Sequence, residues 1–106
     1  MAEPYAEKRR SPRIMWRIPF VVTWTPQAPV TVREQGETEV VNAHGALIKL
    51  STPVRLGRKL KILRPGSPLM QIARVVSNLG EDEAGKIRMG VELDHPNSDF
   101  WVELAR

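Results

Sequence analysis

Apolar residues recur at every second position in several short segments of this chain. The clearest example is residues 87–93, where apolar side chains occupy the first, third, fifth and seventh positions. A period of two places alternate side chains on opposite faces of a β-strand, so that one face of each segment can be buried. No segment keeps an amphipathic helical period for more than two turns. The chain is therefore predicted to fold mainly from short strands.

Six segments are predicted as strands, and each is bounded by prolines, glycines or polar turn residues. They are residues 13–25, 31–41, 46–50, 59–64, 69–78 and 87–93. Pro19 interrupts the first segment and must lie at an edge or a bulge, because proline has no N–H to donate to a sheet. The second segment loses its alternation near Gln35 and Gly36. This spacing predicts an all-β fold, either a small antiparallel barrel or a sandwich.

The last ten residues, 97–106, are predicted to form one helical turn or a closing segment. Phe100 and Trp101 are expected to dock this segment onto the strands. Trp16 and Trp24 alternate in phase with apolar neighbours and are assigned to the core.

Length and composition limit the class of protein. A chain of 106 residues is long enough for one hydrophobic core and too short for two. The absence of cysteine excludes disulfides and thiolate metal sites. No apolar run approaches the ~18 residues that a membrane-spanning helix needs, and the first ten residues are too charged for a signal peptide. We expect a cytoplasmic protein that does not contact membranes.

The sequence contains no recognisable catalytic or metal-binding motif. Its two histidines, His44 and His95, lack the close spacing of paired metal ligands. The acidic run Glu81-Asp82-Glu83 lies between glycines and is typical of a solvated hairpin tip. No nucleophile elbow is present. We therefore predict a binding domain rather than an enzyme, with no metal and no cofactor.

Positive charge is concentrated in two places, and the net charge is +4. Residues 1–12 form a predicted basic, flexible lead before a domain that covers residues 13–106. Arg9, Arg10 and Arg13 lie at the start of the first strand. Guanidinium groups form bidentate hydrogen bonds with phosphate oxygens and with guanine edges. A second group lies in mid-chain and is expected to be a solvated face. Its members are Arg55, Arg58, Lys59, Lys61 and Arg64.

Several segments together resemble a PilZ domain. They are Arg9-Arg10-Ser11-Pro12-Arg13-Ile14, the alternating strand that follows, and the segments Val40 to Ile48, Val54 to Ile62 and Met89 to Leu93. The resemblance covers most of the chain and implies a small six-stranded antiparallel β-barrel with a C-terminal segment. Many PilZ domains bind cyclic di-GMP, a bacterial second messenger, and pass the signal to partner proteins.

The resemblance also implies a ligand site in two parts. The first part is an Arg-x-x-x-Arg motif that binds phosphates and guanine edges, and Arg9 and Arg13 match it. Arg10 is an auxiliary contact. The second part is an Asp/Asn-x-Ser-x-x-Gly motif between the second and third strands, and it is altered in this chain.

Two registers are open for the altered motif. If Gly45 is its last residue, Asn42 replaces the serine and Val40 replaces the acid or amide. This register is preferred, because the third strand then starts after the glycine. If Asn42 is instead the first residue, His44 replaces the serine and Leu47 the glycine. A valine cannot accept from a guanine amino group, whereas the Asn42 amide and the His44 ring are expected to contact the ligand.

The resulting hypothesis is a bacterial receptor or adaptor that binds cyclic di-GMP and an unidentified protein partner. The predicted ligand-binding residues are Arg9, Arg10, Arg13, Asn42, His44 and Gly45. The alternative is a degenerate PilZ-like module that binds proteins and no nucleotide. A barrel that binds nucleic acid is a third hypothesis and is disfavoured, because the few aromatic residues mostly alternate in phase with the core.

Overall fold

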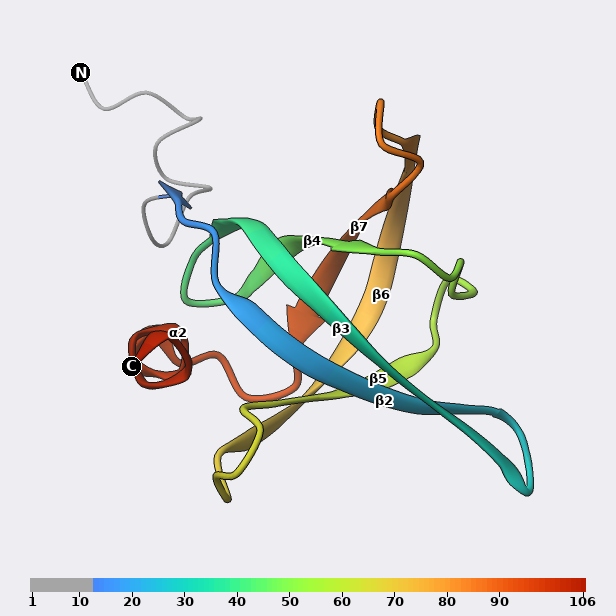
Figure 1. Ribbon diagram of the computed structural model, residues 1–106. Helices are drawn as coiled ribbons and strands as arrows, with labels where there is room; N and C mark the ends of the chain where they lie inside the picture. Colours follow the sequence, from blue (N-terminus) through green and yellow to red (C-terminus); the bar gives the residue numbers. More distant parts are fainter. Residues whose placement is uncertain (1–12) are drawn as a thin grey trace.

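The computed structural model describes residues 13–106 as seven strands and one helix (Figure 1). In chain order these are β1 (Ile14–Met15), β2 (Pro19–Gln27), β3 (Val30–Val41), β4 (Gly45–Leu50), β5 (Lys59–Leu63), β6 (Met70–Glu81), β7 (Ile87–Leu93) and α2 (Ser98–Ala105). The strands predicted from Thr31 onward correspond to β3 to β7. The predicted lead, residues 1–12, lies outside the described residues.

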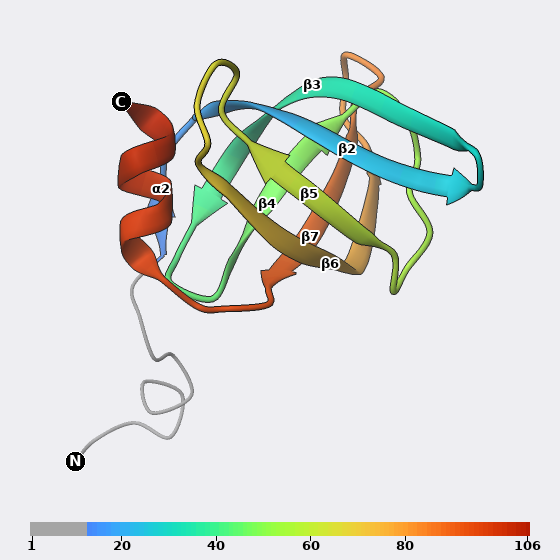
Figure 2. The same cartoon turned by 90° about the horizontal axis from the view of Figure 1, so that it is seen from below.

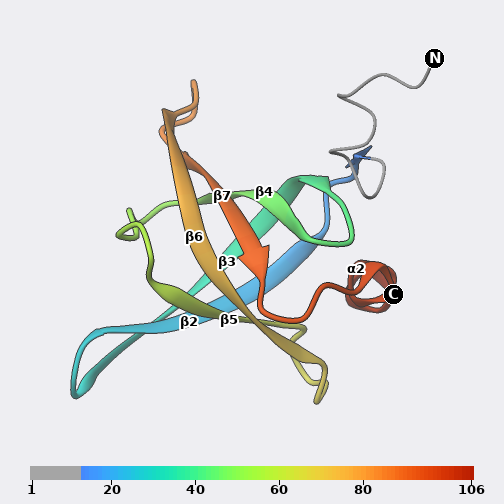
Figure 3. The same cartoon turned by 180° about the vertical axis from the view of Figure 1, so that it is seen from behind.

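Six of the strands close into an antiparallel barrel. Hydrogen-bonded neighbours follow the order β2-β3-β4-β7-β6-β5, and pairing of β5 with β2 completes the ring. Figure 3 shows this ring from behind. The short strand β1 adds a separate pairing with the end of β3. The predicted all-β, six-stranded antiparallel barrel is confirmed, and the sandwich is excluded, because each barrel strand has a partner on both sides.

The first predicted strand is divided in two, so the prediction of one continuous strand is wrong there. Trp16, Arg17 and Ile18 separate β1 from β2, and Pro19 then begins β2 without an N–H to donate. Between β1 and β2, the buried hydroxyl of Thr38 replaces part of the backbone hydrogen bonding that a continuous strand would make. It accepts a hydrogen bond from the backbone N–H of Ile18 at 2.8 Å and donates one to the carbonyl oxygen of Trp16.

Strand β3 bends where the alternation of the sequence weakens. Its first part pairs with β2, and its last part pairs with β4 and β1. Gly36 lies near this change of partner, opposite Phe20. A Cβ atom on Gly36 would come within 2.6 Å of the Leu50 side chain and 2.8 Å of the Lys49 carbonyl oxygen. The glycine therefore lets a continuous strand wrap around the barrel.

The barrel encloses one hydrophobic core to which every barrel strand contributes. Trp24 is buried in it, and Trp16 is half-buried against it, as the alternation predicted. Side chains that are almost completely inaccessible to solvent include Ile18, Val22, Ile48, Leu50, Leu60, Ile62, Val75, Met89 and Trp101.

Helix α2 closes one end of the barrel (Figure 2). Phe100 and Trp101 are buried against the core, as predicted. The indole N–H of Trp101 donates to the carbonyl oxygen of Asn42 at 2.8 Å, and the backbone N–H of Asn97 donates to that of Ala43 at 2.8 Å. These bonds fix the helix to the β3–β4 turn. Within residues 13–106, no helix has the length and apolar character that crossing a membrane requires.

Candidate functional site

A groove on the barrel wall brings together four of the six predicted ligand-binding residues. The four are Arg13, Asn42, His44 and Gly45. The groove has a volume of about 350 Å³ and is lined by the end of β3 and by β4, β6 and β7. The other two predicted residues, Arg9 and Arg10, lie outside the described part of the chain.

The β3–β4 turn is shaped by the side chain of Asn42. Its Oδ1 atom accepts hydrogen bonds from the backbone N–H of His44 at 2.8 Å and of Gly45 at 2.9 Å. The backbone N–H of Asn42 in turn donates to the carbonyl oxygen of Gly45 at 2.9 Å. An asparagine that bonds the backbone two and three residues ahead is typical of a tight turn. Its amide nitrogen forms no hydrogen bond with another described residue, so the amide N–H groups remain as donors.

Gly45 is required by the close approach of β4 to β7. A Cβ atom at this position would overlap the carbonyl oxygen of Val91. Gly45 lies opposite Glu92 in the ladder between these strands. The glycine therefore acts through the backbone, and it leaves the groove beside Glu92 free of a side chain.

Apolar side chains form much of the groove wall. Val40 and Leu47 face each other across the β3–β4 ladder, and Leu79 projects from β6 with 53% of its surface exposed. Pockets for organic ligands commonly combine apolar walls with a few placed polar groups. This groove has the same composition, with Arg13 and Asn42 among its polar groups.

The groove residues that come from β6 and β7 were not predicted from the sequence. They are Ser77, Leu79, Gly90, Val91 and Glu92. Side chains alternate along β7, so Glu92 faces outward. Because Glu92 lies opposite Gly45 of β4, its side chain lines the groove. The pairing of β4 with β7 would have identified Glu92, but alternation alone does not state which strands pair.

The charged side chains that line the groove are Arg13 and Glu92, and Arg74 lies opposite Glu92 in the ladder between β6 and β7. Arg13 is exposed, and neither Arg13 nor Glu92 forms an ion pair with another described residue. A guanidinium binds phosphate oxygens, whereas a carboxylate accepts hydrogen bonds from N–H groups. A ligand that carries both phosphate and N–H donors therefore suits this groove.

A separate ionisable cluster stabilises the barrel. Glu39 accepts from Arg88 at 2.7 Å and lies 3.5 Å from Lys49, which lies 3.2 Å from Asp82. The hydrogen bond from Arg88 holds the pKa of Glu39 below its usual range. Backbone N–H donors, first that of Lys86, lower the pKa of Asp82. Asp82 thus organises the hairpin tip, which the sequence indicated only as a solvated acidic loop.

No family model and no curated protein matches this chain. Among residues 13–106, no three histidine, aspartate or glutamate side chains are grouped so as to hold a metal ion. The function must therefore be inferred from the groove itself.

Proposed function

We propose that this chain is a bacterial, cytoplasmic receptor or adaptor domain that binds cyclic di-GMP in the groove between Arg13 and the β3–β4 turn. One observation carries the proposal. Arg13 and Asn42 belong to separate motifs far apart in the sequence, yet they line the same groove. Arg9 and Arg10 are proposed to complete the site from the lead segment.

The groove offers a different partner to each chemical part of such a ligand. The Arg13 guanidinium is the donor for a phosphate or for the O6/N7 edge of guanine. The apolar side chains of Val40, Leu47 and Leu79 provide surface against which a purine face can pack. The free amide N–H groups of Asn42 are further donors, and the His44 ring is a stacking surface at the turn.

Glu92 offers the acceptor that the altered motif lacks. Valine at position 40 cannot accept from a guanine amino group, and an unpaired buried donor costs about 1–3 kcal/mol. The Glu92 carboxylate lines the same groove and can accept from the N–H groups on the Watson–Crick edge of guanine. We propose that the base is oriented toward Glu92 and the phosphates toward Arg13, which keeps like charges apart.

Calorimetric titration of the full chain with cyclic di-GMP tests this proposal. We expect Arg13→Ala to weaken binding about tenfold to a hundredfold, because a charge-assisted hydrogen bond contributes about 1.5–3 kcal/mol. Glu92→Gln is expected to reduce the preference for cyclic di-GMP over cyclic di-AMP, since a carboxylate suits the donor edge of guanine.

Lys61→Ala is the matched control, because Lys61 lies on β5, across the barrel from β4. Its affinity should stay close to that of the parent. Equal losses for Arg13→Ala and Lys61→Ala would indicate diffuse electrostatic attraction instead of a specific site. If the parent chain shows no binding at high micromolar ligand, the receptor proposal is rejected.

One observation favours the second candidate, a protein-interaction module that binds no nucleotide. Apolar side chains adjoin the groove in an exposed position: Ile14 is 50% exposed and Met15 83% exposed, and both residues pair with the end of β3. Exposed apolar surface of this kind is typical of protein contacts. A chain that binds no cyclic dinucleotide but whose partner contact is lost on Met15→Lys would support this candidate.

A further inference from the structure

The mid-chain basic residues do not form one solvated face. Arg64 donates from Nη1 to the carbonyl oxygen of Glu103 in α2 at 2.9 Å and to that of Arg106, the C-cap residue, at 3.0 Å. Lys59 forms an ion pair with Asp94 at 3.1 Å. Arg55, Arg58 and Lys61 remain, and the two arginines flank a turn that leads into β5.

This turn has a defined backbone. The N–H of Arg58 donates to the carbonyl of Arg55 at 3.1 Å, and the N–H of Gly57 donates to the carbonyl of Val75 at 2.8 Å. Val75 returns a bond to the carbonyl of Arg58 at 3.0 Å. Gly57 has a φ of +86°, a conformation that glycine adopts without steric cost. The turn is therefore tied to β6 through Gly57 and Arg58.

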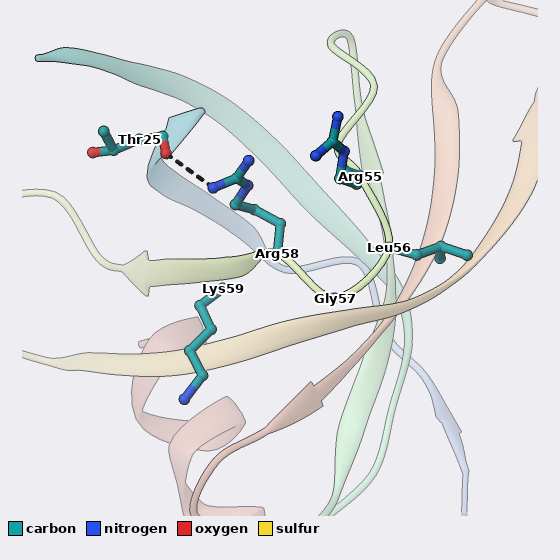
Figure 4. Close-up of a pocket in the computed structure, with 6 residues that line it drawn as sticks. All are labelled: Thr25, Arg55, Leu56, Gly57, Arg58 and Lys59. Atoms are coloured by element: carbon teal, nitrogen blue, oxygen red, sulfur yellow. Dashed lines mark hydrogen bonds between the residues drawn. The ribbon is translucent and has the colours of Figure 1, made fainter. Parts of the chain in front are cut away.

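A pocket of about 540 Å³ lies at this turn (Figure 4). The close-up shows Arg55 and Arg58 rising from the same side of the turn, whereas Lys59 points the other way. Arg58 is held in place by hydrogen bonds to the carbonyl oxygens of Thr25 and Pro26, each 3.2 Å long. No carboxylate lines the pocket.

The two arginines leave many donors and two positive charges unused. A guanidinium has five N–H donors, and Arg58 uses two of them for the β2–β3 hairpin. Arg55 is exposed, and its guanidinium group has no hydrogen-bond or ion-pair partner among residues 13–106. Two uncompensated cations on one side of a preorganised turn match the charge of a phosphate dianion, and planar guanidinium groups fit its oxygens.

We propose that the Arg55–Arg58 turn is a second anion site, which binds a phosphate group. It is a separate site from the groove, because the two pockets share no lining residue. Two further exposed cations, Arg33 and Lys61, both lie next to Thr23 in the β3-β2-β5 order and strengthen the positive potential on this side.

The test is a nuclear magnetic resonance titration of the full chain with pyrophosphate, at about 150 mM salt to screen weak surface attraction. We expect saturable shifts of the backbone amides of Gly57 and Arg58. Arg55→Gln is expected to weaken binding at least fivefold. Its side chain has no hydrogen bond or ion pair to lose among residues 13–106, so this variant is expected to leave the fold intact.

Arg64→Gln is the matched control, since Arg64 flanks the other end of β5 and also donates to two backbone carbonyls. It should leave pyrophosphate affinity unchanged. Equal weakening by Arg55→Gln and Arg64→Gln would overturn the proposal, and so would the absence of saturable shifts at the turn. Loss of cyclic di-GMP binding in Arg13→Ala would not alter this result, so the two proposals fail separately.

Two sources share the chemistry of the site, a small phosphate compound and a phosphorylated side chain of a protein. Tighter binding of pyrophosphate than of a phosphoserine peptide supports the first source. The reverse order supports the second, because the peptide then gains contacts outside the pocket.

Discussion

The connection between β1 and β2, residues 16–18, depends on hydrogen bonds of the Thr38 side chain. We expect Thr38→Val to lower the free energy of unfolding by about 1–3 kcal/mol, because the buried N–H of Ile18 and carbonyl of Trp16 would both lose their partner. Urea unfolding measures the change. Thr38→Ser keeps a hydroxyl and should restore part of the loss.

Thr31→Val provides the control for Thr38. Thr31 is exposed and shares its hydroxyl hydrogen bond with Thr25 at 3.1 Å. Its replacement should change stability by less than about 0.5 kcal/mol. Similar losses of stability for Thr38→Val and Thr31→Val would mean that the Thr38 hydroxyl contributes no more than an exposed hydroxyl.

At the scale of single residues, sequence motifs identified part of the groove. Arg13, Asn42, His44 and Gly45 were predicted because they fall in the two motifs that the resemblance to PilZ domains implies. Glu92 was not found, since an outward glutamate on an alternating strand is ordinary. Its significance comes from register with another strand, which is a property of tertiary structure.

At the scale of elements, the ion-pair cluster joins β3, β4 and β7 to the β6–β7 hairpin. Glu39 has a lowered pKa because it accepts from Arg88, so its charged form stabilises the fold. This contribution is present above the ordinary glutamate pKa, about 4.3, and is lost as the pH falls through the lowered value. We expect Glu39→Gln to destabilise the protein at neutral pH.

Urea unfolding of the parent and Glu39→Gln from neutral pH to pH 3 measures this dependence. The stability difference should shrink as the solution becomes more acidic. Glu103→Gln is the control, because its ion pair with Arg106 is exposed. A difference for Glu39→Gln that stays constant with pH would assign the loss to packing rather than to charge.

Alternation predicted the elements well, because a period of two reports which face of a strand is buried. It did not predict the break at residues 16–18, where a side-chain hydroxyl on β3 takes part in the hydrogen bonding. It also did not predict that β3 continues through Gly36. There the weakened pattern marks a strand that changes partners, and such a change depends on the closure of the barrel.

At the scale of the molecule, α2 completes the core. We expect Trp101→Ala to lower the free energy of unfolding by about 3–5 kcal/mol, because it removes a large buried side chain and its hydrogen bond to Asn42. Far-ultraviolet circular dichroism should lose helical signal while the strand signal persists.

Val102→Ala is the matched control, since Val102 lies on the same helix and is 42% exposed. It should cost less than about 0.5 kcal/mol. If Trp101→Ala were no more destabilising than Val102→Ala, the helix would contribute little to the closure of the barrel.

The bonds from Trp101 and Asn97 end on Asn42 and Ala43, in the turn that forms one side of the groove. Docking of α2 and ordering of the β3–β4 turn therefore depend on the same hydrogen bonds. By thermodynamic linkage, each of the two favours the other to the same extent. A ligand in the groove that binds better when the turn is ordered also favours the docked helix. The factor by which docking of α2 raises the affinity of the ligand equals the factor by which the ligand raises the equilibrium constant for docking. A protein that pulls α2 away from the barrel lowers that affinity without touching the groove.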